Sequence, residues 1–122
     1  MMRKIAKTAL AILVSSFVGG WAYAHPVLQA SNPGGGATVP PPREVRLIFS
    51  ENVIPKFSGL TIKDDNGALI ETAGPSTDPN DKRQLVVPIV NPIPPGTYNV
   101  DWHAVSVDTH KVSGHFSFKV AP

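Results

Sequence analysis

The sequence contains no cysteine, and its only two methionines are its first two residues. Without cysteine the chain forms neither disulfide bonds nor thiolate metal sites, which excludes iron–sulfur clusters and structural zinc–thiolate centres. Since residues 3–122 also lack methionine, a methionine-rich Cu(I) site is excluded. The stability of the fold must therefore come from packing, and any bound metal must have nitrogen and oxygen ligands.

A long hydrophobic run is also missing. The apolar core at residues 9–18 is shorter than the roughly 20 residues that a transmembrane helix needs. Residues 1–7 before it carry three bases and no acid, and Ala22-Tyr23-Ala24 after it is a small-x-small site. These three parts are typical of a secretory signal peptide, and we expect cleavage after Ala24. The alternative is an uncleaved N-terminal anchor extending through Trp21, which the short run disfavours.

Cleavage would divide the chain into a signal peptide at 1–24 and one domain at 25–122, long enough for a single core. Three of the 11 bases leave with the signal peptide, so eight bases and 9 acids remain and the formal charge falls from +2 to −1. No basic patch then favours nucleic acid or an anionic membrane surface. We expect a secreted domain that binds no nucleic acid and does not insert into the membrane once mature.

Helical periodicity is absent. All 13 prolines follow residue 25, and a proline in a helix interior costs about 3 kcal/mol. The pattern instead predicts strands at 44–49, 60–63, 68–72, 84–89, 98–106 and 115–120, with a strand or extended arm at 25–30. Asn66-Gly67 predicts a hairpin turn, whereas 31–42, 50–57, 74–83 and 91–96 are predicted to be irregular. About seven short strands favour an all-β, immunoglobulin-like antiparallel β-sandwich of Greek-key type.

Two strands have a clear apolar face. In the predicted strand 98–106, the apolar face consists of Tyr98, Val100, Trp102 and Ala104. The polar residues Asn99, Asp101 and His103 alternate with them. In the last strand the expected inward residues are Phe116, Phe118 and Val120.

An Asp-x-His pair, Asp108 and His110, follows directly on the clearest predicted strand. In an extended stretch, residues two apart point to the same side, so both side chains could reach one ion. The simpler interpretation is an Asx-type turn, with Asp108 capping the loop and His110 solvated.

His25 would become the N-terminal residue after cleavage. Its α-amine and ring nitrogen could then chelate one metal ion. The ordinary pKa of an α-amine is about 7.7–8.0, so a metal ion can displace its proton near neutral pH. Pro26 has no amide hydrogen, so a metal ion cannot recruit the next backbone nitrogen. Taken alone, His25 could equally be an unstructured end of the chain.

Together, His25, Asp108 and His110 make a nitrogen-rich set supplemented by one carboxylate. Such tetragonal sites suit Cu(II), which heads the Irving–Williams order, with zinc as the competitor. His103 and His115 are expected on polar strand faces, where solvated histidines are more usual than a second metal site, although the two could pair if their strands are neighbours. Spacing alone assigns no metal role to Glu51.

Several segments of the sequence resemble the CopC family of periplasmic copper-resistance proteins. They are His25-Pro26, LIFSENV at 47–53, PGTYNVDW at 95–102, and WHAVSVDTH at 102–110 followed by SG at 113–114 and FSFKV at 116–120. The resemblance spans residues 25–122 in order.

The resemblance implies a β-sandwich that binds Cu(II) through the amine and ring of His25, the carboxylate of Asp108 and the ring of His110. Glu51 would lie near the site as a weaker ligand or a supporting group. Many members also carry a methionine-rich Cu(I) site, but residues 74–83 contain no methionine, so this chain resembles the Cu(II)-only variety. His103 stands where members commonly carry arginine, and it could alter how Asp108 is held or lie close to the site.

The main hypothesis is a periplasmic, monomeric and non-enzymatic copper carrier or buffer that passes Cu(II) to an inner-membrane, CopD-like transporter or to an export system. A second hypothesis is a copper-dependent oxidative enzyme with an N-terminal histidine chelate. It is disfavoured because Asp108 would occupy the open position that catalysis needs. A third is a metal-free immunoglobulin-like interaction module, since fold alone does not give function.

Overall fold

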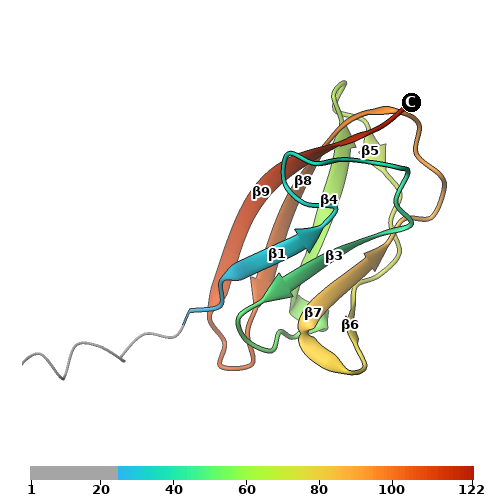
Figure 1. Ribbon diagram of the computed structural model, residues 1–122. Helices are drawn as coiled ribbons and strands as arrows, with labels where there is room; N and C mark the ends of the chain where they lie inside the picture. The colour runs from blue at the N-terminus through green and yellow to red at the C-terminus, as the bar shows by residue number, and fades with distance from the viewer. Residues whose placement is uncertain (1–24) are drawn as a thin grey trace, which may run out of the picture.

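A computed structural model describes residues 25–122, so the expected signal peptide lies outside the described part. Two sheets pack face to face (Figure 1). The first has the order β1 (Leu28–Asn32), β3 (Glu44–Phe49), β7 (Asp81–Pro88) and β6 (Ser76–Asp78). The second has the order β2 (Thr38–Val39), β9 (Lys111–Val120), β8 (Gly96–Val105), β4 (Gly59–Asp64) and β5 (Leu69–Ile70). A short 3₁₀ helix, η3 (Pro55–Phe57), precedes β4.

The predicted all-β sandwich is confirmed. Every strand pair is antiparallel except that of β2 with β9, where Thr38 and Val39 lie parallel to Lys119 and Val120. Within residues 25–122 no helix is long and apolar enough to cross a membrane.

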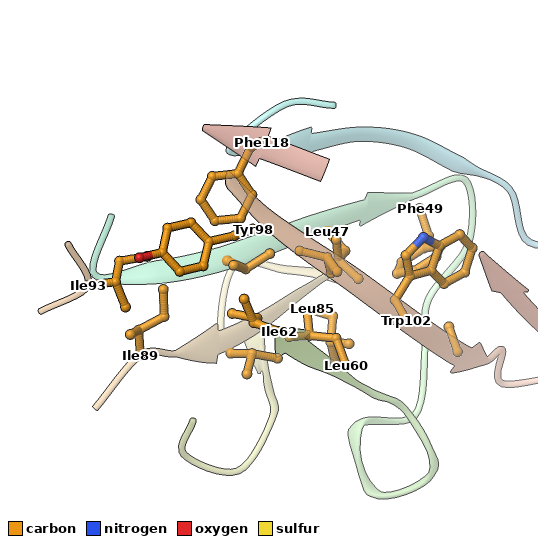
Figure 2. Close-up of a cluster of buried hydrophobic side chains, with 14 of the residues drawn as sticks. Leu47, Phe49, Leu60, Ile62, Leu85, Ile89, Ile93, Tyr98, Trp102 and Phe118 are labelled. Carbon is orange, nitrogen blue, oxygen red and sulfur yellow. The ribbon is translucent and has the colours of Figure 1, made fainter. Parts of the chain in front are cut away.

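The core lies between the two sheets and follows the predicted alternation. In β8, Tyr98, Val100, Trp102 and Ala104 are buried, whereas Asn99, Asp101 and His103 are exposed. The ring of Phe49 from β3 meets the indole of Trp102 from β8 edge to face, with centroids 5.5 Å apart, and this contact joins the sheets (Figure 2). In β9, Phe118 and Val120 are buried and Phe116 packs partly buried against the core.

The predicted Asn-Gly hairpin is confirmed, because β4 pairs with β5 across it. Gly67 adopts a φ of 83°, which glycine reaches without steric cost. The Oδ1 atom of Asp64 accepts hydrogen bonds from the backbone N–H groups of Asn66 and Ala68, both at 2.9 Å. Local turn chemistry therefore fixes this connection.

The prediction of a polar loop at 74–83 is wrong. Residues 76–78 form β6, which pairs with β7. Strand β7 begins at Asp81, three residues earlier than predicted. This hairpin has few apolar side chains to reveal it, because it lies at a sheet edge and is held by polar contacts. Arg46 Nη1 lies 2.7 Å from Asp78 Oδ2 across the sheet, and the Asn80 N–H donates to Asp78 Oδ1. Residues 31–42, also predicted to be irregular, contain the end of β1 and all of β2.

β8 and β9 form the longest hairpin of the described chain, pairing from Gly96 with Val120 to Val105 with Lys111. Within it Trp102 lies opposite Gly114. A Cβ atom built on Gly114 would meet the indole at 2.6 Å, closer than real Cβ contacts allow. The glycine thus makes room for the largest side chain of the core.

We expect Gly114→Ala to lower the free energy of unfolding by about 1–3 kcal/mol, the usual cost of forcing extra volume into a packed core. Denaturant unfolding followed by circular dichroism measures the change. Gly74→Ala is the matched control, because no atom lies within 4 Å of its added Cβ, and it should change stability by less than about 0.5 kcal/mol. Equal effects of the two substitutions would contradict this account of Gly114.

Candidate metal site

The loop between β8 and β9, residues 106–110, closes the long hairpin with a tight turn. The Ser106 N–H donates to the His110 carbonyl at 2.9 Å, and the Thr109 N–H donates to the Ser106 carbonyl at 2.8 Å. Thr109 has a φ of 71°, in the left-handed region that a β-branched residue seldom adopts. The simpler of the two interpretations, a turn and not an extended stretch, therefore holds, and it brings the side chains of Asp108 and His110 together.

Asp108 and His110 form a pair at the surface. The Nδ1 atom of His110 lies 3.1 Å from Oδ2 of Asp108, and the two side chains are 47% and 43% exposed respectively. The Ser106 hydroxyl donates a short hydrogen bond to the other carboxylate oxygen, Oδ1. This hydroxyl, followed by His110, lowers the pKa of Asp108 below its ordinary value. The carboxylate is therefore ionised near neutral pH and available as an anionic ligand.

The segment 50–58 anchors the loop to the sandwich. The Val107 N–H donates to the Asn52 carbonyl at 3.1 Å, and Val53 forms an isolated bridge with Ser106. One step further, the Ile54 N–H donates to the Val105 carbonyl at 2.8 Å. Backbone hydrogen bonds thus hold the loop from the side as well as through the hairpin.

The N-terminal arm, residues 25–27, contacts the same segment 50–58. The Val27 N–H donates to Ser50 Oγ at 2.9 Å, and the Ser50 N–H donates back to the Val27 carbonyl at 2.9 Å. Pro26 is buried, and the ring of His25 packs edge to face against the ring of His110, with centroids 4.9 Å apart. The arm and the β8–β9 turn therefore meet at one end of the molecule (Figure 1).

His25, Asp108 and His110 are neighbours, but their present arrangement is not a ready-made coordination sphere. Within residues 25–122 no three His, Asp or Glu side chains are grouped so that they could hold a metal ion. The two imidazole rings meet at an interplanar angle of 76°, and Nδ1 of His110 faces the carboxylate. Their role as metal ligands therefore stays a prediction.

The remaining candidates lie around this centre. Glu51 is half-buried on the segment between the arm and the loop, and its carboxylate makes no hydrogen bond or ion pair with the described residues. His103 lies opposite Ser113, and His115 lies opposite Asp101, so the two histidines are not cross-strand partners. The ring of His103 covers Gly59. It also lines a surface groove together with Phe57 and with Thr109 of the loop.

Ser106 is the residue whose contribution the sequence did not reveal. Its side chain is fully buried, bonds Asp108 and receives the His110 N–H at 3.3 Å. A serine two residues before an aspartate is the one signal that could have indicated a local turn bond. Ser106 thus adds a buried cap to a turn in which the Asp108 carboxylate also interacts with the His110 backbone N–H, as in an Asx-type turn.

Three kinds of comparison agree on the family. The CopC domain model matches residues 28–121. Protein YobA of Escherichia coli strain K12 is 42% identical over 113 residues, covering 92% of this chain and 91% of that protein. Copper resistance protein C of Escherichia coli is 39% identical over 122 residues, covering 90% and 94%. The crystal structure of PcoC, a methionine-rich copper resistance protein from Escherichia coli, superposes with a TM-score of 0.73 at 35% identity, covering 80% of this chain and 100% of that one. With the family model spanning nearly all of the described sandwich, this chain belongs to the CopC family.

Proposed function

We propose that this protein is a periplasmic copper-binding protein that sequesters or carries Cu(II) in copper resistance and homeostasis. The observation that carries the proposal is the contact between the His25 and His110 rings beside the Asp108 carboxylate. Residues separated by more than 80 positions meet there, and they are the donor types that Cu(II) prefers. The relatives that are named as copper resistance proteins also support copper as the bound metal.

The proposed ligands are the α-amine and ring of His25, the carboxylate of Asp108 and the ring of His110. The amine becomes available once the signal peptide at 1–24 is removed, which also defines 25–122 as the mature domain. The related PcoC is described as methionine-rich, whereas residues 3–122 here contain no methionine. A single site for cupric ion, without a second site for Cu(I), follows from this difference.

Surface exposure suits the site to cargo transfer. Nearly half of each of the Asp108 and His110 side chains is open to solvent. The arm, η3 and the loop each carry an exposed apolar residue: Val27 is 57% exposed, Phe57 55% and Val107 60%. These side chains would add apolar contact area with a protein that receives the ion. A CopD-like inner-membrane transporter would receive the ion here, and the protein itself performs no chemistry on a substrate.

Removing individual ligands tests the site. In the mature protein that begins at His25, His25→Ala should weaken Cu(II) binding by more than about 100-fold, since the loss of a ligand should exceed the usual effect of outer-shell residues. His25→Ala removes the ring but leaves an amine, and N-terminal acetylation removes the amine but leaves the ring, so both break the chelate. Each should cost more than Asp108→Asn, which should cost at least about tenfold. Competition titrations with a chromophoric chelator measure these affinities.

His115→Ala is the control for these titrations, because His115 is an exposed histidine placed opposite Asp101 and not beside the loop. It should bind Cu(II) as the wild type does. Equal affinity of the wild-type, His25→Ala and acetylated proteins would exclude a terminal chelate.

Copper should also stabilise the folded mature protein. A ligand that binds only the native state contributes about 2.7 kcal/mol when its free concentration is 100 times Kd. For a domain of this size that corresponds to a rise in Tm of roughly 10–20 °C, measured by scanning calorimetry with and without buffered Cu(II). Zn(II) at equal free concentration should raise Tm less. An unchanged Tm with Cu(II) would instead favour a metal-free interaction module.

A further inference from the structure

Two serines are the only buried polar residues in the described part of the chain. Ser58 is 5% exposed and Ser106 is fully buried, and both lie at the end of the sandwich that carries the Asp108 loop. Burying a hydroxyl is unfavourable unless it is hydrogen-bonded, so each should have a structural or functional purpose. Their partners distinguish them.

Ser58 bonds only to backbone. Its hydroxyl donates to the Ile54 carbonyl at 2.7 Å and accepts the Val105 N–H at 3.0 Å. These bonds tie η3 to the end of β8. They involve neither Asp108 nor His110, so Ser58 secures the surrounding fold.

Ser106 bonds to the site itself. Its hydroxyl hydrogen is given to Oδ1 of Asp108, and its oxygen accepts the His110 N–H at 3.3 Å. The His110 carbonyl, 3.4 Å away, is the weaker competitor for that single hydrogen, because a bond to a charged carboxylate is stronger. One buried atom thus contacts both halves of the Asp-x-His pair.

We propose that Ser106 is the positioning residue of the copper site, holding Asp108 and His110 in register before the metal arrives. With Oδ1 occupied by the buried hydroxyl, Oδ2 is left facing the imidazole of His110 and is the oxygen available to an ion. The second bond, to the His110 N–H, fixes the backbone from which that ring projects. This inference rests on the proposed function, because it assigns a role within that site.

Pre-organisation of this kind has a physical basis. Thr109, between the two ligands, is held at a positive φ, which a threonine adopts only when its surroundings impose it. Ser106 supplies bonds on both sides of Thr109, to residues 108 and 110. Backbone hydrogen bonds would still hold the loop without them, but the Asp108 carboxylate could rotate, so part of the binding free energy would be used to restore its orientation.

The test compares Cu(II) affinity in mature proteins altered at the two serines. Ser106→Ala should weaken binding about 10–100-fold, as loss of a group that orients a metal ligand does. It should also change the electron paramagnetic resonance spectrum of the bound Cu(II). Ser58→Ala should lower Tm but leave affinity and spectrum unchanged, since its bonds reach neither ligand. Equal affinities of the wild type, Ser106→Ala and Ser58→Ala would overturn the inference.

A second pair of variants keeps the test valid if Ser106→Ala folds poorly. Ser106→Thr and Ser106→Val add similar volume, but only threonine retains the hydroxyl, so Ser106→Thr should bind Cu(II) at least about tenfold more tightly than Ser106→Val. Equal binding by the two would overturn the inference. In an Asp108→Ala background, most of the effect of Ser106→Ala should disappear, because the two residues act together. Full additivity would contradict it.

Failure of this inference and failure of the proposed function give different results. If the wild-type protein binds no Cu(II), the proposed site itself is wrong. If the wild type binds Cu(II) in a manner that depends on His25, but Ser106 variants bind equally well, only the positioning role of Ser106 is excluded.

Discussion

The register of β8 against β9 is the constraint on which the rest of the structure depends. Ten residues of each strand pair without a shift, from Gly96 with Val120 to Val105 with Lys111. A slip of one residue would exchange the buried and exposed faces of a strand, and the core side chains of β8 prohibit this. The opposition of Gly114 to Trp102 adds a steric requirement at one position. The ladder therefore determines where the turn at 106–110 is placed.

The same end of the sandwich gathers three segments that are distant in sequence. Residues 50–58 form the common support: Ser50 bonds the arm at Val27, and Asn52 bonds the loop at Val107. This explains why rings at the N-terminal arm and in the last hairpin meet, although neither segment pairs with the other directly. Two of the proposed ligands, Asp108 and His110, remain 43% and 47% exposed, so their side chains have room to turn toward an ion.

The sequence predicted those parts whose cause is local. Alternation identified the faces of β3, β8 and β9, and Asn66-Gly67 located a hairpin because only certain residues adopt that turn. It failed for β6, whose pairing depends on the cross-sheet contact of Asp78 with Arg46 and not on an apolar pattern. The role of Ser106 was not predicted for a similar reason. Its burial and its bonds to Asp108 and His110 depend on the tertiary structure, and a serine in a turn is common. The proximity of His25 to His110 could be suspected from ligand chemistry, but only the support at Ser50 accounts for it.

Completion of the proposed site depends on a covalent event outside the fold. While residue 24 is attached, the nitrogen of His25 is a peptide amide, which has no basic lone pair to bind a metal near neutral pH. The ring of His25, the carboxylate of Asp108 and the ring of His110 are already neighbours, although not arranged as a coordination sphere, and cleavage would add one strong nitrogen donor to them. Pro26 would then prevent the ion from recruiting the following backbone nitrogen, as it could in a flexible peptide, because proline has no amide hydrogen to lose. On this reasoning, high copper affinity would arise only after export, which would keep the precursor from capturing the metal before it reaches the periplasm.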